Sequence, residues 1–188
     1  MKIGITGGIG SGKSYVCQRL AARGIRVYDC DAAAKRLIRT ETSLREALSR
    51  LIGADAFCAD GQLNKSAVAR FLLASEEHAH AIDGIVHPAV FRDFEQSGIR
   101  WMESAILYES GICRLVDRVV VVTAPEEERI RRVMLRDGIT REKVLQWMQR
   151  QLPQEEVRRR ADYEIVNDGE ADIDAQLDRL LLELRIKN

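Results

Sequence analysis

The chain opens with a glycine-rich stretch, GITGGIGSGKS, that runs from Gly4 to Ser14. Glycine destabilises the interior of a helix or a strand because it loses the most conformational freedom on folding, so this stretch is predicted to be a loop. Within it, Gly7, Gly12, Lys13 and Ser14 fit the pattern G-x-x-x-x-G-K-S/T. In that pattern the backbone N–H groups of the loop point inward at phosphate oxygens. The stretch therefore predicts a site for a nucleoside triphosphate.

The pattern requires a strand before the loop and a helix after it, and the flanking residues provide both. Residues 2–6 match a short strand, and the stretch from Tyr15 to Gly24 has apolar residues at helical spacing. Lys13 is expected to reach the β- and γ-phosphates of ATP, and the hydroxyl of Ser14 is expected to bind Mg²⁺. The other residues expected to contact the nucleotide lie in the same loop or just after it: Gly8, Ile9, Gly10, Ser11, Gly12 and Tyr15.

Five apolar segments are predicted as strands: 2–6, 25–29, 99–107, 117–125 and 163–168. Helical patterns lie between them, and a strand–loop–helix–strand order with short crossovers predicts a parallel sheet. We therefore expect the α/β class, with a parallel five-stranded sheet flanked by helices. The last helix is expected from Ile173 to Lys187, where leucines and an isoleucine recur on one face.

The segment between the second and third predicted strands is helical in pattern and contains no convincing strand. A chain of 188 residues suits one domain. We therefore interpret residues 41–98 as a helical insertion into a single domain. The turn after Arg136 leads into a new helix, which is typical of a mobile lid. The expected division is a core at 1–40, 99–135 and 160–188, the insertion at 41–98 and a lid at 136–159.

Charge and hydropathy narrow the classes of partner. The 29 Lys and Arg residues balance the 29 Asp and Glu residues, which argues against nucleic acid as a partner. No apolar run is long enough to span a membrane, and the N-terminus lacks the layout of a signal peptide. We therefore expect a cytoplasmic protein without a membrane partner. Four separate cysteines are expected to be buried as small hydrophobic residues: Cys17, Cys30, Cys58 and Cys113.

A phosphate-binding loop alone leaves three classes of protein open: a kinase for a small acceptor, a nucleotide switch or motor, and a pure binding module. A GTPase switch should contain N-K-x-D to read guanine and a D-x-x-G motif. The chain has one N-K pair, at Asn64 and Lys65, without the aspartate, and it has no D-x-x-G. These absences disfavour the switch.

The helix predicted after Pro125 carries three arginines, Arg129, Arg132 and Arg136, spaced three and four residues apart. That spacing places them on one helical face. Guanidinium groups stabilise the charge on a phosphoryl group during its transfer, so the face favours a kinase over a binding module. The alternative is a solvated basic face that pairs with the glutamates Glu126 and Glu128.

Three acidic residues are candidates for chemistry at the carboxyl ends of strands, where ligands bind in open parallel sheets. Asp29 and Asp31 follow the second strand, and either carboxylate is able to orient an acceptor hydroxyl and take its proton. The alternative is that both cap the next helix, for which Asp31 is well placed. Glu103, in the third strand, is a candidate for holding Mg²⁺ through water, or else it is a partly exposed strand end.

Several stretches occur in the order seen in dephospho-CoA kinases, which this chain resembles over nearly its whole length. They are TGGIGSGKS, VYDCDAAAKRL, HPAV, ESAILYESG, RDGITREKV and RQLPQEEVRRRADYEIVNDG. The glycine loop is generic. The D-x-D after the second strand, the pair His87-Pro88 and the segment that opens at Gln151 and reaches Asn167 are more specific.

The resemblance implies a P-loop kinase fold with a helical acceptor-binding insertion and a lid. It also implies transfer of the γ-phosphoryl group of ATP to the ribose 3′-hydroxyl of dephospho-CoA, the last step of coenzyme A synthesis. By position, Asp31 looks like the catalytic base, while Lys13 and Arg136 look like catalytic phosphate ligands. The remaining implied contacts are Arg132 and Asn167 on the nucleotide side, and His87, Tyr108 and Glu109 on the acceptor side.

Two positions depart from the family pattern. Ala105 stands where the family has proline. Lys65 stands where the family tends to have arginine, and a lysine keeps the positive charge but lacks the bidentate fork of the guanidinium. Without the resemblance, His87 would be incidental and Pro88 would open a helix. Another small-molecule or nucleoside kinase of this fold stays the alternative function. We expect a monomer, with weak self-association as the alternative.

Overall fold

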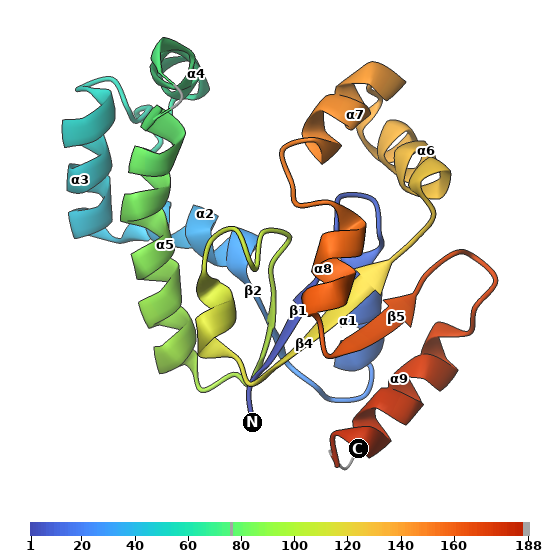
Figure 1. The fold of residues 1–188 in the computed structure, drawn as a ribbon. Helices are drawn as coiled ribbons and strands as arrows, with labels where there is room; N and C mark the ends of the chain where they lie inside the picture. Colours follow the sequence, from blue (N-terminus) through green and yellow to red (C-terminus); the bar gives the residue numbers. More distant parts are fainter. Residues whose placement is uncertain (76, 186–188) are drawn as a thin grey trace. The chain divides into compact units, whose positions relative to one another are not determined.

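The computed structural model describes residues 1–75 and 77–185. Five strands form one sheet: β1 (Ile3–Thr6), β2 (Val27–Asp29), β3 (Trp101–Glu103), β4 (Arg118–Thr123) and β5 (Tyr163–Val166). The helices are α1 (Lys13–Ala21), α2 (Cys30–Thr40), α3 (Thr42–Ile52), α4 (Lys65–Ala74), α5 (Glu77–Ser97), α6 (Glu126–Asp137), α7 (Arg141–Met148), α8 (Gln154–Arg160) and α9 (Ile173–Glu183), with a short 3₁₀ helix at Ile112–Leu115. Figure 1 labels these elements.

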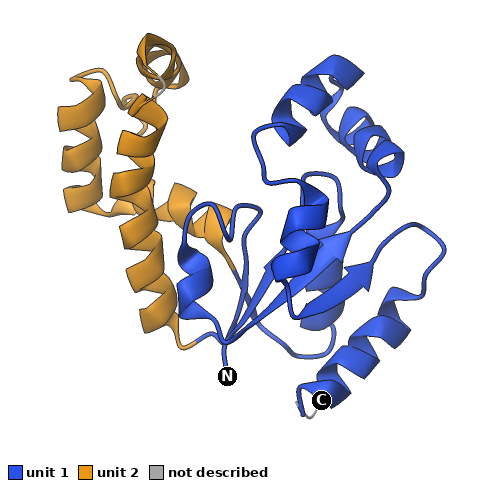
Figure 2. Cartoon of the chain, viewed as in Figure 1, with its two compact units in different colours: residues 1–28, 99–188 blue, residues 29–98 orange. Residues whose placement is uncertain are grey.

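The chain divides into two compact units, which Figure 2 colours separately. Residues 1–28 and 99–188 form the unit that contains most of the sheet, here called the sheet unit. Residues 29–98 form the helical unit. The insertion predicted at 41–98 lies inside the helical unit, which also includes α2.

The strand order is β2-β3-β1-β4-β5, so β1 lies at the centre of the sheet. Strand β1 pairs in parallel with β3 and with β4, and β4 pairs in parallel with β5. The predicted parallel five-stranded sheet is therefore confirmed. The central position of β1 follows from its sequence, because a strand that is buried on both faces needs a continuous apolar run, and all four of its residues are buried.

Helices α1 and α9 cover one face of the sheet. Apolar residues of both helices meet those of β1, β4 and β5 in one cluster that includes Ile3, Val16, Val122, Ile165 and Leu177. Helix α8 crosses the other face at β4 (Figure 1). Because helices pack on both faces of the sheet, β1 and the loop that follows it are held in position.

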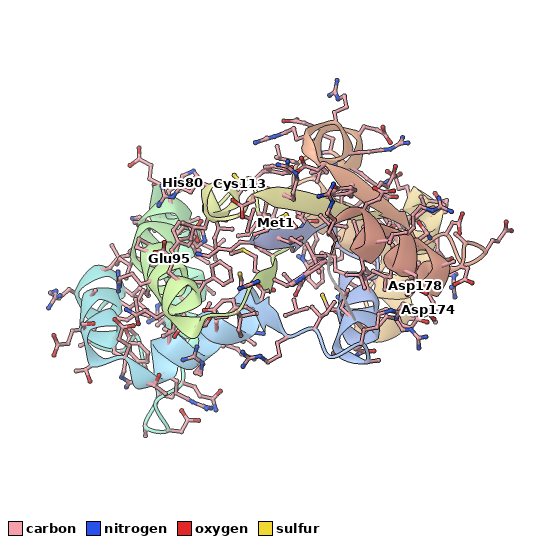
Figure 3. All side chains as sticks on the ribbon, turned by 90° about the horizontal axis from the view of Figure 1, so that it is seen from below. Met1, His80, Glu95, Cys113, Asp174 and Asp178 are labelled. Atoms are coloured by element: carbon pink, nitrogen blue, oxygen red, sulfur yellow. The ribbon has the colours of Figure 1, made fainter. Side chains whose placement is uncertain are left out.

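Ion pairs connect the outer surfaces of α1 and α9. Arg23, just after α1, pairs with Asp174 and Asp178 of α9, at 2.8 Å in both cases, and Arg19 of α1 also pairs with Asp174. Figure 3 labels the two aspartates at the edge of the molecule. Surface pairs of this kind stabilise a fold by a few tenths of a kcal/mol to about 1 kcal/mol each.

The predicted strands and the last helix are shorter than expected. The third strand, predicted at 99–107, ends at Glu103, because the chain turns after Ser104 donates its N–H to the carbonyl of Ile5 at 3.0 Å. The second strand begins at Val27 rather than Ile25. The last helix ends at Glu183, and Ile186 and Lys187 of its predicted range lie outside the described residues.

In the helical unit, α2 and α3 pack against the long helix α5, and α4 packs against α3 and α5. Figure 3 labels His80 and Glu95 on α5. The interpretation of Pro88 as the first residue of a helix is wrong, since Pro88 lies inside α5. The expectation that all four cysteines are buried is also wrong: Cys30 is buried, but Cys58 is exposed and Cys17 and Cys113 are half-buried.

No helix within residues 1–75 and 77–185 combines the length and the apolar character that a membrane span requires.

Candidate active site

The glycine loop joins β1 to α1, as its sequence predicts. Gly12 caps α1 in the left-handed region, with φ 92°, so the first N–H groups of the helix face the loop. Gly10 has φ 79°, and a Cβ atom there would collide with the backbone of Arg129. Both positions need glycine because the backbone is left-handed and because another residue lies too close for a side chain. The loop is thereby able to turn its N–H groups inward, as the binding of a phosphate chain requires.

Lys13 stands at the first residue of α1, and its side chain is 9% exposed. Its Nζ donates a hydrogen bond to the carbonyl of Gly7 at 2.8 Å, and it lies 4.0 Å from Oε1 of Glu103. Glu103 is the last residue of β3, next to β1 in the sheet. The structure thus brings the predicted phosphate ligand and the predicted metal ligand together at the carboxyl edge of the sheet.

Arg129 of α6 lies beneath the loop and is 6% exposed. Its Nε donates to the carbonyl of Ile9 at 3.0 Å, and its guanidinium lies so close to Gly8 that a Cβ atom there would collide with it. Burial lowers the pKa of Arg129. Within the described residues Arg129 forms no ion pair. It therefore contributes a buried positive charge next to the glycine loop.

Arg132 approaches the loop from the next turn of α6. It donates to the carbonyl of Asn167 at 3.0 Å and, at 3.5 Å, to the carbonyls of Gly10 and Ser11. It also pairs with Glu128 at 2.9 Å, as the solvated-face alternative expects. The pair with Glu128 agrees with the solvated-face alternative, and the role of Arg132 on a bound nucleotide stays a prediction.

Arg136, on the last turn of α6, differs from the other two arginines. Its side chain is 62% exposed and pairs with Asp137 at 2.7 Å, which raises the pKa of Arg136. The helix ends at Gly138, in the left-handed region with φ 64°. The predicted role of Arg136 on a transferring phosphoryl group stays a prediction.

Asn167 follows β5 and holds the far side of the glycine loop. Its Nδ2 donates to the carbonyl of Ser11 at 2.8 Å, and a Cβ atom on Gly12 would collide with its amide. Its own carbonyl accepts from Arg132. These bonds show that Asn167 supports the loop, and its implied contact with the nucleotide stays a prediction.

Two glutamines that we did not predict form further hydrogen bonds near the site, Gln151 with the loop and Gln154 with the segment after β4. The Oε1 of Gln151 accepts from the N–H of Ile9 at 2.8 Å, while its Nε2 donates to the carbonyl of Ala105 at 3.3 Å. Gln154 exchanges hydrogen bonds with the backbone of Ala124, at 3.2 and 3.3 Å. A glutamine carries no local signal for such a role, although Gln151 opens one of the family-specific segments.

Tyr108 and Glu109, predicted to contact the acceptor, lie after β3 in the sheet unit. Glu109 accepts from the N–H of Leu152 at 3.0 Å. The ring of Tyr108 lies under the guanidinium of Arg160 at 4.0 Å, and burial raises the pKa of Tyr108. The hydroxyls of Tyr108 and Ser11 are buried and accept or donate no hydrogen bond within the described residues.

Asp31 and His87 belong to the helical unit, so the approach of either residue to the phosphate loop stays a prediction. Asp29 is the N-cap of α2, and its Oδ1 accepts from the N–H of Ala32 at 2.9 Å. The expectation that Asp31 caps this helix is wrong, because α2 begins at Cys30 and Asp31 therefore lies in its first turn, with an exposed side chain. His87 lies 3.6 Å from Asp83 and stacks on Phe91.

The residues predicted to hold Mg²⁺ are Ser14, which is exposed on the first turn of α1, and Glu103. Within the described residues no group of three or more His, Cys, Asp or Glu side chains is arranged to hold a metal ion. A protein of this design supplies few ligands of its own, since Mg²⁺ in phosphoryl transfer takes most of its oxygens from phosphates and water.

Known proteins resemble this chain in sequence and in fold. Residues 1–172 match the CoaE family, dephospho-CoA kinase. The chain belongs to the dephospho-CoA kinase family. The dephospho-CoA kinase of Bacteroides fragilis YCH46 is 42% identical over 188 residues, which cover 96% of this chain and 91% of that protein.

Solved structures agree with this family. The crystal structure of TT1252 from Thermus thermophilus has a TM-score of 0.84 and 37% sequence identity, with 98% of this chain and 97% of that chain covered. The dephospho-CoA kinase from Campylobacter jejuni has a TM-score of 0.66 at 20% identity, with 98% of both chains covered, and so supports the fold.

Membership of the dephospho-CoA kinase family confirms the predicted P-loop kinase fold. It also confirms the prediction of a phosphotransferase over a nucleotide switch or a binding module. The family implies ATP as the phosphoryl donor, which agrees with the geometry of the loop from Gly7 to Ser14.

Proposed function

We propose that this chain transfers the γ-phosphoryl group of ATP to the ribose 3′-hydroxyl of dephospho-CoA, which gives coenzyme A and ADP in the cytoplasm. The observation that carries the proposal is the phosphate loop between β1 and α1, with Lys13 buried against it, in a chain of the dephospho-CoA kinase family. The loop supplies a site for the donor, and the family supplies the acceptor.

The sheet unit provides the donor site in this proposal. The N–H groups of Gly10, Gly12, Lys13 and Ser14 bind the phosphates, and Lys13 turns its Nζ from the carbonyl of Gly7 to the β- and γ-phosphate oxygens. Arg132 adds a second cation at the loop. Because these groups are fixed before the reaction, they stabilise charge in the transition state without reorganisation.

Ser14 and Glu103 are the proposed protein contacts of Mg²⁺, Ser14 directly and Glu103 through water. An exposed hydroxyl and a carboxylate at the carboxyl edge of the sheet are hard oxygen ligands, which suit this ion. When bound, Mg²⁺ neutralises charge on the β- and γ-phosphates.

In this proposal the helical unit binds the acceptor through the insertion predicted at 41–98. Residues 136–159 act as the lid. Asp31 orients the 3′-hydroxyl and takes its proton, and His87, Tyr108 and Glu109 contact the acceptor. An exposed carboxylate on the first turn of α2 supports the role of Asp31, since its oxygens are not used by the helix cap. We expect the chain to act as a monomer.

An assay of ADP release with a panel of hydroxyl acceptors tests this function. We expect turnover with dephospho-CoA and background rates with adenosine, AMP, shikimate and gluconate. If dephospho-CoA is inert and another member of the panel is phosphorylated, the chain is a different small-molecule kinase of the same fold.

Among the arginines of α6, Arg136 is expected to affect turnover most. Arg136→Ala should lower turnover by about 10³-fold with little change in ATP affinity, because a transition-state arginine acts on charge that develops during transfer. Arg131→Ala is the control on the same helix, since Arg131 is exposed and pairs with Glu128. A change in turnover of less than about threefold for Arg136→Ala would favour the solvated face instead.

Gln151→Leu should raise the KM for ATP by up to about 30-fold, because it removes two hydrogen bonds of about 1 kcal/mol each that hold Ile9 and Ala105. Gln151→Glu keeps an oxygen that accepts from the N–H of Ile9, but its carboxylate does not donate to the carbonyl of Ala105, so it should raise the KM for ATP less than the leucine variant does. Steady-state kinetics at neutral pH measure both effects. Gln149→Leu, two residues away and exposed, is the control, and equal effects for the two leucine variants would contradict this role of Gln151.

A further inference from the structure

Arg129 of α6 contacts the glycine loop from the outside, at the backbone of Ile9. Its Nε donates to the carbonyl of Ile9 at 3.0 Å, and its Nη1 donates to Oε1 of Gln154 at 3.5 Å. Its Nη2 forms no hydrogen bond within the described residues and lies next to Gly8. The spacing of the arginines predicts an action on the phosphoryl group, whereas these contacts place the guanidinium against the backbone of the loop.

The hydrogen bond from Arg129 orients one peptide unit of the loop. The carbonyl of Ile9 and the N–H of Gly10 are the two ends of the same trans peptide, so they point in opposite directions. Because the carbonyl is held toward α6, the N–H of Gly10 faces away from α6. Within the described residues that N–H donates to no acceptor. A phosphate oxygen is a suitable acceptor for a backbone donor that is oriented in this way.

Asn167 holds a second peptide unit of the loop in the same manner. Its Nδ2 donates to the carbonyl of Ser11 at 2.8 Å, and the N–H at the other end of that peptide belongs to Gly12. The N–H of Gly12 also donates to no acceptor within the part of the chain that the structure describes. Two side chains therefore bind outer carbonyls of the loop, and each carbonyl lies opposite an N–H that is available to a phosphate. Arg129 differs from Asn167 in its charge.

The positive charge of Arg129 is not needed for the hydrogen bond to Ile9, which a neutral amide is also able to make. Arg129 is buried and forms no ion pair within the described residues. Glu126, in the first turn of α6, raises the pKa of Arg129 less than burial lowers it. A buried cation without a paired carboxylate destabilises a fold. A bound nucleotide brings negative charge to the inner side of the loop, where this cation stabilises it.

We propose that Arg129 is a positioning residue of the donor site. Its guanidinium fixes the peptide between Ile9 and Gly10 with the N–H turned toward the phosphates, and the bound nucleotide balances its charge across the loop. Arg129 thus acts through the backbone, which separates it from the role predicted for Arg136 on the transferred group. The proposal rests on the donor half of the proposed function and does not depend on the identity of the acceptor.

Arg129→Gln in the full chain separates the charge from the hydrogen bond, because Nε2 of glutamine is as many bonds from Cα as Nε of arginine. The Kd for ADP with Mg²⁺, measured by titration calorimetry, should rise about tenfold. The nucleotide-free variant should melt no earlier than the original chain, because it loses an unpaired buried charge. Arg129→Lys keeps the charge and should bind ADP within about threefold of the original chain. Arg131→Gln is the matched control, since Arg131 is exposed and pairs with Glu128, and it should change neither quantity appreciably.

A purely structural arginine gives the opposite pattern, in which Arg129→Gln melts earlier and binds ADP as the original chain does. Unchanged binding of ADP, at whatever melting temperature, would overturn the proposal. In the kinetic assay the KM for ATP should rise with the Kd while kcat stays within about threefold, because the loop binds the ground state and the transition state alike. If dephospho-CoA proves inert as an acceptor, the calorimetry with ADP still decides the role of Arg129.

Gly8→Ala tests the same contact without removing the charge. A Cβ atom at this position collides with the guanidinium of Arg129, so the variant should displace that group and weaken the binding of ADP. Glutamine lacks the outer atoms of the guanidinium, so Gly8→Ala should weaken binding less in the Arg129→Gln chain than in the original chain. Equal effects of Gly8→Ala in the two chains would show that the guanidinium does not position the loop, and the proposal would be wrong.

Discussion

Lys13→Ala should abolish phosphoryl transfer while the chain stays folded. The variant removes the one side-chain cation that the glycine loop places at the start of α1, and loss of such a preorganised group lowers turnover by on the order of 10³-fold. Its cost in stability should be about 1–3 kcal/mol, because the carbonyl of Gly7 loses the hydrogen bond from Nζ. Turnover in the ADP-release assay and thermal unfolding by circular dichroism measure the two quantities separately.

Two further variants control for this experiment. Lys13→Met keeps most of the buried stem and removes only the charge, so it should lose the same activity at a smaller cost in stability. Arg26→Ala removes an exposed cation elsewhere in the sheet unit and should leave both quantities unchanged. An active Lys13→Met enzyme would show that Lys13 does not bind the transferring phosphate.

Asp31→Asn should lower turnover by about 10²-fold or more, the usual effect of losing a general base. In a loose, dissociative transition state the carboxylate mainly orients the hydroxyl and removes the proton late, so both substrates should still bind. Stability should hold, since Asp29 and not Asp31 caps α2. Turnover with dephospho-CoA, the two KM values and the melting temperature are the measurements.

Asp29→Asn is the matched control, two residues away. Asparagine also accepts the hydrogen bond from the N–H of Ala32, so the cap of α2 is kept and the effect on turnover should be milder. Near-normal turnover of Asp31→Asn, together with earlier melting, would assign Asp31 to structure and leave Asp29 as the next candidate for the base.

The sequence predicts the sheet and the phosphate loop well because their signals are local. The loop pattern specifies its own backbone, and the runs of Val and Ile in β1 and β4 match strands that are buried on both faces. The same signal extends the third strand too far, to 107. Apolar residues such as Leu107 are buried in the turn after β3 as fully as in a strand, and periodicity does not separate the two.

The parts of the site that depend on distant contacts are less predictable. Helical spacing places Arg129, Arg132 and Arg136 on one face of a helix. It does not predict that Arg129 is buried next to Gly8, or that Arg136 is exposed beside Asp137. Gln151 has no local signal at all, because its partners Ile9 and Ala105 are far away in the sequence. That Asp29 and not Asp31 caps α2 reflects a two-residue difference in the start of the helix, which is within the usual uncertainty of a helix boundary.

The most direct test of the proposed function is the structure of the product. Stoichiometric ATP and dephospho-CoA are incubated with the chain and Mg²⁺, and the reaction is followed by phosphorus NMR and mass spectrometry. We predict one new phosphate monoester on the ribose 3′-oxygen, a mass increase of one phosphoryl group on dephospho-CoA, and one ADP for each coenzyme A. Release of ADP with dephospho-CoA unchanged, or a phosphate at another hydroxyl, would contradict the proposed function.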